Sequence, residues 1–313
     1  MFLCIAMLLA ADAQPFFQRG VNFTAERPDN YSSEGAQKRL AALTEHGVNA
    51  VAFVPYGFSR AGEPSVRLGG ERSMERDSSI VQLAAVAHRN RMKVMLKPQV
   101  WSGRLGPSEL DYASAEDRKK WFASYREFIG HYAELAQNIH ADLFCVGVEF
   151  VKLNKHEAEW RSVIAHVRKY YSGPLTYAAN FGPEFETTRF WDALDYIGLN
   201  NYYPLPASDA VNRVETVQKR FRKPVIFPEA GYASLVDAGK KPWDDTRRQI
   251  SLEEQKRCYE ALLEAFYRKP WFQGMYVWKI GSNGFGGSAD GSHTPWRKPA
   301  MDVLKRWYLD GGR

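Results

Sequence analysis

Two glutamates stand where runs of apolar residues end. Glu149 follows the apolar run 144–148, and Glu229 closes the run 225–229. A carboxylate is costly to bury unless it has partners or chemical work. Either glutamate alone could cap a helix or pair with a Lys or Arg. Together they are candidates for a division of labour in which one carboxyl donates a proton and the other attacks as an anion.

Further polar and aromatic residues stand where other β-rich runs end. Flat rings can stack on the C–H faces of a sugar, while amides and phenols can bond its hydroxyls. Each residue alone also has a packing or turn explanation. Within the run 93–101, alternation directs Lys97, Gln99 and Trp101 to the same side. The candidate substrate-binding residues are Lys97, Gln99, Trp101, Asn180, Tyr202 and Trp278.

These residues must be positioned by repeated strand and helix segments. Eight β-rich runs are predicted, at residues 18–24, 50–58, 93–101, 143–150, 174–181, 196–205, 224–232 and 273–281. Amphipathic stretches between or after them predict helices at 34–46, 80–90, 115–138, 156–171, 210–221, 252–268 and 298–308. The strands are apolar on both faces, which is typical of a parallel sheet covered by helices.

This α/β pattern favours one domain, a single (β/α)₈ barrel over residues 14–313. An open doubly wound sheet is the alternative, although no Gly-x-Gly-x-x-Gly follows the first strand. In such a barrel the polar strand ends gather at one face. The fourth and seventh strands lie across its mouth, so Glu149 and Glu229 could approach to about 5 Å, the spacing of retaining glycoside hydrolases. The longest connections, 59–79, 102–114, 233–251 and 282–297, open on the same face.

Composition excludes several classes of protein. The 313 residues are 45% hydrophobic and 25% charged, as in a folded globular chain. The net charge of +6 is not concentrated, so we expect no nucleic-acid partner. The three cysteines and seven histidines show no zinc-ligand spacing, and we expect neither a metal nor another cofactor. The oligomeric state cannot be deduced from this pattern.

The N-terminal segment 1–13 is apolar and ends in Ala-Asp-Ala, which resembles a signal-peptidase site. We therefore expect a signal peptide and a periplasmic or secreted bacterial protein. A buried N-terminal segment, an incorrectly assigned start and a cytoplasmic location remain alternatives. No later stretch is long and apolar enough to predict a membrane span.

Several motifs in this order resemble glycoside hydrolase family 113, a (β/α)₈ family in a large clan of retaining glycosidases. They are Leu96-Lys-Pro-Gln-Val100, Val146-Gly-Val-Glu-Phe150, Ile197-Gly-Leu-Asn-Asn-Tyr-Tyr-Pro-Leu205, Ile226-Phe-Pro-Glu-Ala-Gly-Tyr232, Val277-Trp278 and His293-Thr-Pro-Trp-Arg-Lys-Pro-Ala300. The resemblance covers nearly all of residues 14–313. It implies that Glu149 is the acid/base, that Glu229 is the nucleophile, and that the substrate is a β-linked polysaccharide or oligosaccharide, chiefly β-1,4-mannan.

Two positions depart from related chains. Most of the clan has Asn before the acid/base, where this chain has Val148, although family 113 itself tends to lack that Asn. Related chains are expected to have His where Gln99 stands. The alternatives to a mannanase are a non-catalytic glycan-binding barrel, a glycosidase for glucan, xylan or a glucosaminide, and an acyl hydrolase or phosphate-handling barrel. The last pair lacks support, because neither a Gly-x-Ser-x-Gly elbow nor a phosphate-loop lysine is present.

Overall fold

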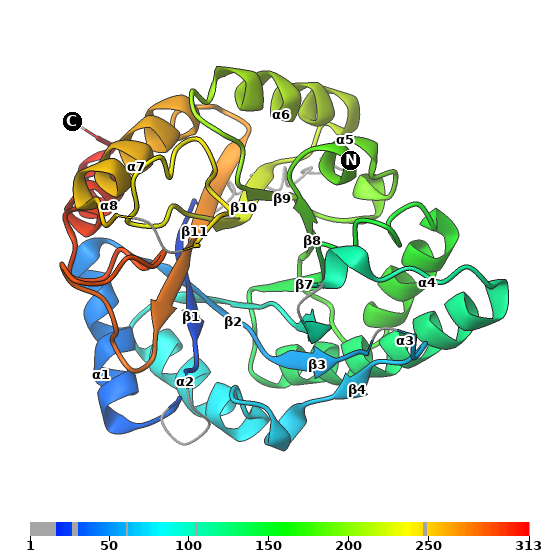
Figure 1. Ribbon diagram of the computed structural model, residues 1–313. Helices are drawn as coiled ribbons and strands as arrows, with labels where there is room; N and C mark the ends of the chain where they lie inside the picture. The colour runs from blue at the N-terminus through cyan, green and yellow to red at the C-terminus, as the bar shows by residue number, and fades with distance from the viewer. Residues whose placement is uncertain (1–16, 27–30, 61, 104–105, 247–248, 313) are drawn as a thin grey trace, which may run out of the picture.

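The computed structural model confirms a (β/α)₈ barrel (Figure 1). It describes residues 17–26, 31–60, 62–103, 106–246 and 249–312, so the predicted signal peptide lies outside the described residues. The closed parallel barrel runs in the order β1-β11-β10-β9-β8-β7-β5-β2. Its strands are β1 (Gln18–Thr24), β2 (Ala50–Phe53), β5 (Lys93–Leu96), β7 (Leu143–Val148), β8 (Leu175–Asn180), β9 (Ile197–Asn201), β10 (Val225–Ala230) and β11 (Phe272–Gly281).

The predicted second and third strands are each divided in two. Pro55 and Pro98 fall where the barrel strands β2 and β5 end, and proline cannot donate a hydrogen bond to a neighbouring strand. Beyond these prolines the chain forms β3 (Tyr56–Phe58) and β6 (Gln99–Trp101). With β4 (Arg67–Leu68) they make a separate sheet in the order β4-β3-β6. Single strands over 50–58 and 93–101 were therefore wrong.

Within the described residues eight α-helices surround the barrel (Figure 1), of which the short α5 was not predicted. Three helices begin at the predicted residues 34, 115 and 252, which confirms these starts. The serine before each of them, Ser33, Ser114 or Ser251, accepts a hydrogen bond from a backbone N–H of the first turn. The helices are α1 (Glu34–Ala42), α2 (Asp77–Arg89), α3 (Ala115–Asn138), α4 (Glu157–Val167), α5 (Pro183–Thr187), α6 (Ser208–Phe221), α7 (Leu252–Phe266) and α8 (Pro299–Asp310).

The strands bury both faces, as predicted. Along β2, Ala50 and Ala52 belong to the cluster inside the barrel, while Val51 and Phe53 pack in the cluster that includes the helices. Tyr276 fills one part of the interior, and a side chain on Gly20 would meet its ring at 2.3 Å. Within the described ranges, no helix has both the length and the apolar character needed to cross a bilayer.

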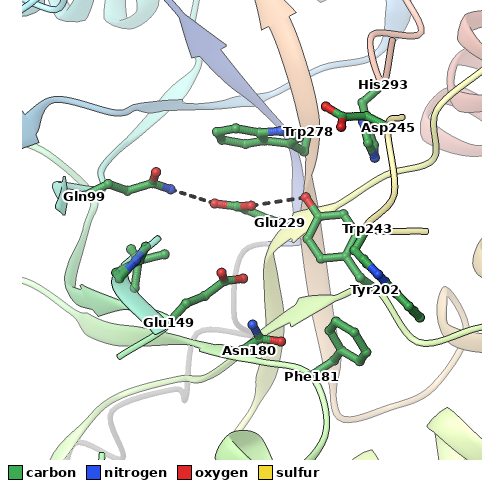
Figure 2. Close-up of a pocket in the computed structure, with 12 residues that line it drawn as sticks. Gln99, Glu149, Asn180, Phe181, Tyr202, Glu229, Trp243, Asp245, Trp278 and His293 are labelled. Carbon is green, nitrogen blue, oxygen red and sulfur yellow. Dashed lines mark hydrogen bonds between the residues drawn. The ribbon is translucent and has the colours of Figure 1, made fainter. Parts of the chain in front are cut away.

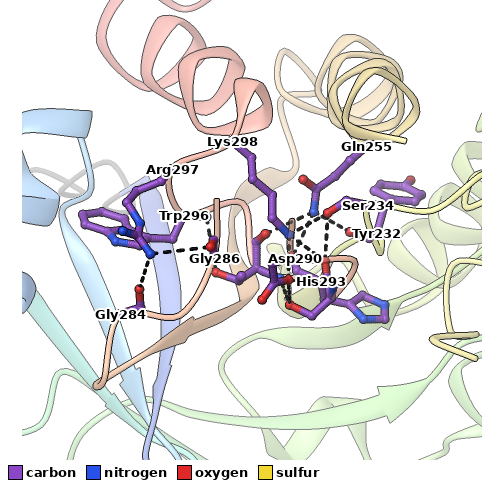
Figure 3. A network of polar contacts seen from close by, with 12 residues as sticks. Tyr232, Ser234, Gln255, Gly284, Gly286, Asp290, His293, Trp296, Arg297 and Lys298 are labelled. Atoms are coloured by element: carbon purple, nitrogen blue, oxygen red, sulfur yellow. Dashed lines mark hydrogen bonds and ion pairs between the residues drawn. The ribbon is translucent and has the colours of Figure 1, made fainter. Parts of the chain in front are cut away.

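A buried lysine ties together the two loops that follow β10 and β11 (Figure 3). The side chain of Lys298 is fully buried. Its Nζ donates to Ser234 Oγ at 2.6 Å, to Asp290 Oδ1 at 3.0 Å and to the Ser292 carbonyl at 3.1 Å. Because a buried charge needs such partners, this contact fixes one loop against the other.

Three further contacts extend the same connection. Gln255 on α7 donates to the carbonyl oxygens of Tyr232 at 2.8 Å and His293 at 3.1 Å. The ring of His293 lies 2.8 Å, through Nε2, from the carbonyl oxygen of Pro242. Both loops are thus held in one arrangement above the barrel.

Removal of the Lys298 charge is expected to destabilise the fold. In Lys298→Met the apolar stem remains, but Asp290 and Ser234 lose a donor, so we expect the free energy of unfolding to fall by about 1–3 kcal/mol. Lys305→Met on the exposed face of α8 is the matched control, with an expected change within about 0.5 kcal/mol. Urea denaturation measures both, and equal losses would contradict a stabilising role for Lys298.

Candidate active site

A cavity of about 300 Å³ lies at the carboxyl ends of the barrel strands (Figure 2). Both candidate glutamates line it, and their carboxyl groups project into it. Its walls come from strand ends and from the loops after β6, β10 and β11. The lining residues are Gln99, Pro107, Val148, Glu149, Asn180, Phe181, Tyr202, Glu229, Trp243, Asp245, Trp278 and His293.

Glu229, near the end of β10, is surrounded by hydrogen-bond donors. Lys97 donates to Oε1 and forms an ion pair with it. Gln99 Nε2 donates to the same oxygen at 2.8 Å, and the Tyr202 hydroxyl donates to Oε2 at 3.1 Å. A carboxylate that accepts from an ammonium, an amide and a phenol is stabilised in its ionised form. Glu229 is therefore arranged as an anion.

Glu149 has a different environment. Its Oε1 accepts a hydrogen bond of 2.9 Å from Asn200 Nδ2. The group is partly accessible from the cavity but is enclosed by protein, and this burial, with the charge of Glu229 as a second cause, raises its pKa to about 7. The Asn200 hydrogen bond and the more distant Lys97 oppose the shift without cancelling it. Glu149 can therefore hold a proton near neutral pH.

The backbone at Glu149 is also unusual. Its φ is 53°, in the left-handed region that residues with a side chain rarely adopt. Such a conformation costs on the order of 1–3 kcal/mol and persists only when surrounding contacts hold it. Here the Glu149 N–H donates to the Ala178 carbonyl at 2.9 Å, which fixes the strand end against β8.

The sequence-predicted residues are only partly brought together. Asn180, Tyr202 and Trp278 line the cavity beside the two glutamates (Figure 2). Lys97 has a fully buried side chain, and its Nζ lies 5.0 Å from the centroid of the Trp278 ring. Trp101 lies in the small sheet, 58% exposed and outside the cavity lining. Substrate contact by these residues stays a prediction.

Other polar and aromatic residues of this site were not predicted, among them Asn200, Trp243, Asp245 and His293. Asn200 is fully buried and bonds Glu149, and the pair Asn200-Asn201 at the end of an apolar strand was a usable signal. Trp243 stacks on Phe181 with ring centroids 5.2 Å apart, and is 49% exposed. With Asp245 and His293 it comes from the long loops, where sequence spacing carries no directional information. These loop residues form one wall of the cavity.

The arrangement can support acid-assisted displacement. One carboxyl group can hold a proton and another is stabilised as an anion in the same cavity, and such separation is what acid and nucleophile require. Among the residues that the structure describes, no group of three or more His, Cys, Asp or Glu could hold a metal ion. Cys145 and Cys258 are buried and free, while Cys4 lies outside the described residues.

The chain is similar to solved mannanase structures. A GH113 β-mannanase from Alicyclobacillus acidocaldarius, in complex with ManMIm, is 34% identical with a TM-score of 0.88, over 94% of this chain and 97% of that chain. A GH113 β-1,4-mannanase in a complex structure is 28% identical with a TM-score of 0.86, over 94% and 99%. A comparison with curated proteins finds no match.

More distant structures share the fold alone. A Faecalibacterium prausnitzii β-glucuronidase is 16% identical with a TM-score of 0.65, over 95% of this chain and 49% of that chain. The sequence model of Glycoside Hydrolase Family 113 matches residues 21–288. This match covers most of the chain and includes both glutamates of the cavity. The chain therefore belongs to glycoside hydrolase family 113.

Proposed function

We propose that this glycoside hydrolase cleaves β-1,4-mannan with retention of anomeric configuration. Glu149 protonates the glycosidic oxygen, Glu229 attacks the anomeric carbon, and Glu149 then activates the water that releases the sugar. The observation that carries this proposal is the contrast between the two carboxyl groups: donors surround Glu229, whereas burial raises the pKa of Glu149.

The neighbouring residues support this assignment. Lys97, Gln99 and Tyr202 orient the nucleophile and keep it anionic until it attacks. Trp278 offers a partly exposed ring at the cavity, suited to stacking on a sugar face. The side chain of Asn180 lies across the cavity from it (Figure 2), where an amide could bond a hydroxyl.

The substrate assignment is supported by the mannanases to which the chain is similar. The shape of the surface favours a polymer. A second hollow of about 500 Å³ also has Asp245 in its lining, so the two hollows adjoin at this residue. The exposed Trp101 ring offers a further platform near this face. Two adjoining hollows offer room for sugar units beyond the one that is attacked, and we infer endo cleavage.

The roles of the two glutamates differ in their dependence on the leaving group. Glu229→Ala should abolish turnover of every substrate. Glu149→Ala should reduce hydrolysis of β-mannan by about 10²–10⁴-fold but spare the formation of the glycosyl-enzyme from activated aryl β-mannosides, whose leaving group hardly needs a proton. Burst and steady-state kinetics on both substrates measure this. Equal losses of the bond-cleaving step would contradict the assignment of Glu149.

The protonated state of Glu149 sets a pH limit. As pH rises above about 7, Glu149 loses its proton, and kcat/KM for mannan should therefore fall. A pH series of kcat/KM, which reports the free enzyme, measures this. An aryl mannoside with a good leaving group is the control, and its decline above pH 7 should be weaker. An identical decline would mean that another group titrates.

A substrate panel tests the reaction itself. β-Mannan, glucomannan, β-glucan, xylan and chitosan should be compared, with product sizes by chromatography and the first-formed anomer by NMR. We expect β-mannan to give short oligosaccharides in the β configuration. Binding without turnover of any glycan would support a non-catalytic barrel. Preferred turnover of another glycan would contradict the assignment of mannan as the substrate. Products in the α configuration would contradict the double displacement.

A further inference from the structure

The backbone N–H of Phe150, the residue after Glu149, donates to a side-chain hydroxyl and not to a backbone carbonyl. Phe150 N–H donates to the Tyr177 hydroxyl at 3.0 Å, while the Glu149 N–H donates to the Ala178 carbonyl of the same strand, β8. The left-handed backbone of Glu149, with φ at 53°, thus lies between two hydrogen bonds to β8. Only the bond to Tyr177 can be removed by changing a side chain.

The Tyr177 hydroxyl is itself oriented by a buried carboxyl. Tyr177 is fully buried, and its hydroxyl donates to Glu184 Oε1 at 2.5 Å. A phenol has one proton to donate. Because that proton points at Glu184, a lone pair of the oxygen remains for the Phe150 N–H. Glu184 therefore determines which role the Tyr177 hydroxyl has toward the strand that ends in Glu149.

Glu184 also holds the neighbouring wall of the cavity. Its Oε2 accepts from the backbone N–H of Asn180 at 2.6 Å, and Asn180 lines the cavity. Asn154 Nδ2 donates to Oε1 at 3.3 Å. One buried carboxyl thereby connects the end of β8 with the residue after Glu149.

Burying the Glu184 carboxyl group costs more free energy than a purely structural contact would justify. Glu184 is 2% exposed, and burial raises its pKa to about 8. Its partners are a phenol, an amide and a backbone N–H, and none of the ion pairs found among the described residues includes it. Buried ionisable groups with shifted pKa values concentrate at functional sites. Glu184 lies directly behind the candidate acid/base.

We propose that Tyr177 and Glu184 are positioning residues that hold Glu149 where its carboxyl group can protonate the departing oxygen, an inference that rests on the proposed function of Glu149. Neither residue lines the cavity. They act through the backbone at Phe150, so their loss should displace the proton donor and leave the nucleophile Glu229 with all its partners.

The test is the ratio of activity on β-mannan to activity on an activated aryl β-mannoside, with the bond-cleaving step measured for both. A displaced proton donor harms mannan cleavage selectively, whereas partial unfolding lowers both activities equally. We expect Tyr177→Phe to lower the ratio about 10-fold or more, part of the full effect of a general acid. Glu184→Ala removes the oxygen atoms that accept from the Tyr177 hydroxyl and the Asn180 N–H, and should lower the ratio in the same way.

Tyr125→Phe is the matched control. Tyr125 is also fully buried, and its hydroxyl donates to the Val146 carbonyl of β7 at 2.8 Å. The control removes a phenolic bond to the same strand but not the one next to Glu149, so the ratio should stay within about 2-fold of the wild type. The double variant of Tyr177 and Glu184 should lose no more than the worse single variant, because the two act in one chain of contacts.

The outcomes separate this inference from the proposed function. An unchanged ratio in Tyr177→Phe, or a change equal to that in Tyr125→Phe, would overturn the positioning role if Glu149→Ala still lowers the ratio. If Glu149→Ala leaves the ratio unchanged, or the wild-type protein cleaves neither substrate, the proposed function fails and the positioning role fails with it. The positioning role is supported only if Tyr177→Phe and Glu184→Ala both lose activity on β-mannan selectively.

Discussion

Two carboxyl groups in one cavity must be kept in different protonation states, and the rest of the site depends on that constraint. Like charges at close range oppose joint ionisation. The two carboxyl groups have unequal surroundings. Lys97, Gln99 and Tyr202 all donate hydrogen bonds to Glu229, whereas Glu149 accepts one hydrogen bond, from the amide of Asn200. Burial then raises the pKa of Glu149, with the Glu229 charge adding to the shift.

This asymmetry is a product of the barrel. The partners of Glu229 come from the segment after β5 and from the end of β9, and they meet β10 because the closed sheet directs its strand ends toward one cavity. The strand register pairs Glu229 with Asn200, and Asn200 with Asn180, so these three polar residues lie at the same height along the barrel. The loops add a wall, which the buried Lys298 holds in place.

Much of the fold could be predicted, because hydrophobic periodicity records burial on local elements. The eight strand positions and several helix starts followed from it. The division of the second and third strands at Pro55 and Pro98 was missed, although proline is a local signal. The short α5 carries too little periodicity to be found, yet it contains Glu184, whose carboxyl group bonds Tyr177 and Asn180.

The sequence by itself determined which residues could do chemistry: Glu149 and Glu229 at strand ends, with aromatic and amide residues at others. Only the tertiary structure decided their partners. Lys97 and Gln99 were predicted as donors to a substrate. In the structure both donate to Glu229, which lies 132 and 130 residues further along the chain. Such contacts depend on barrel closure and strand register. Side-chain alternation specifies which face of a strand a residue occupies, but not which distant residue lies opposite it.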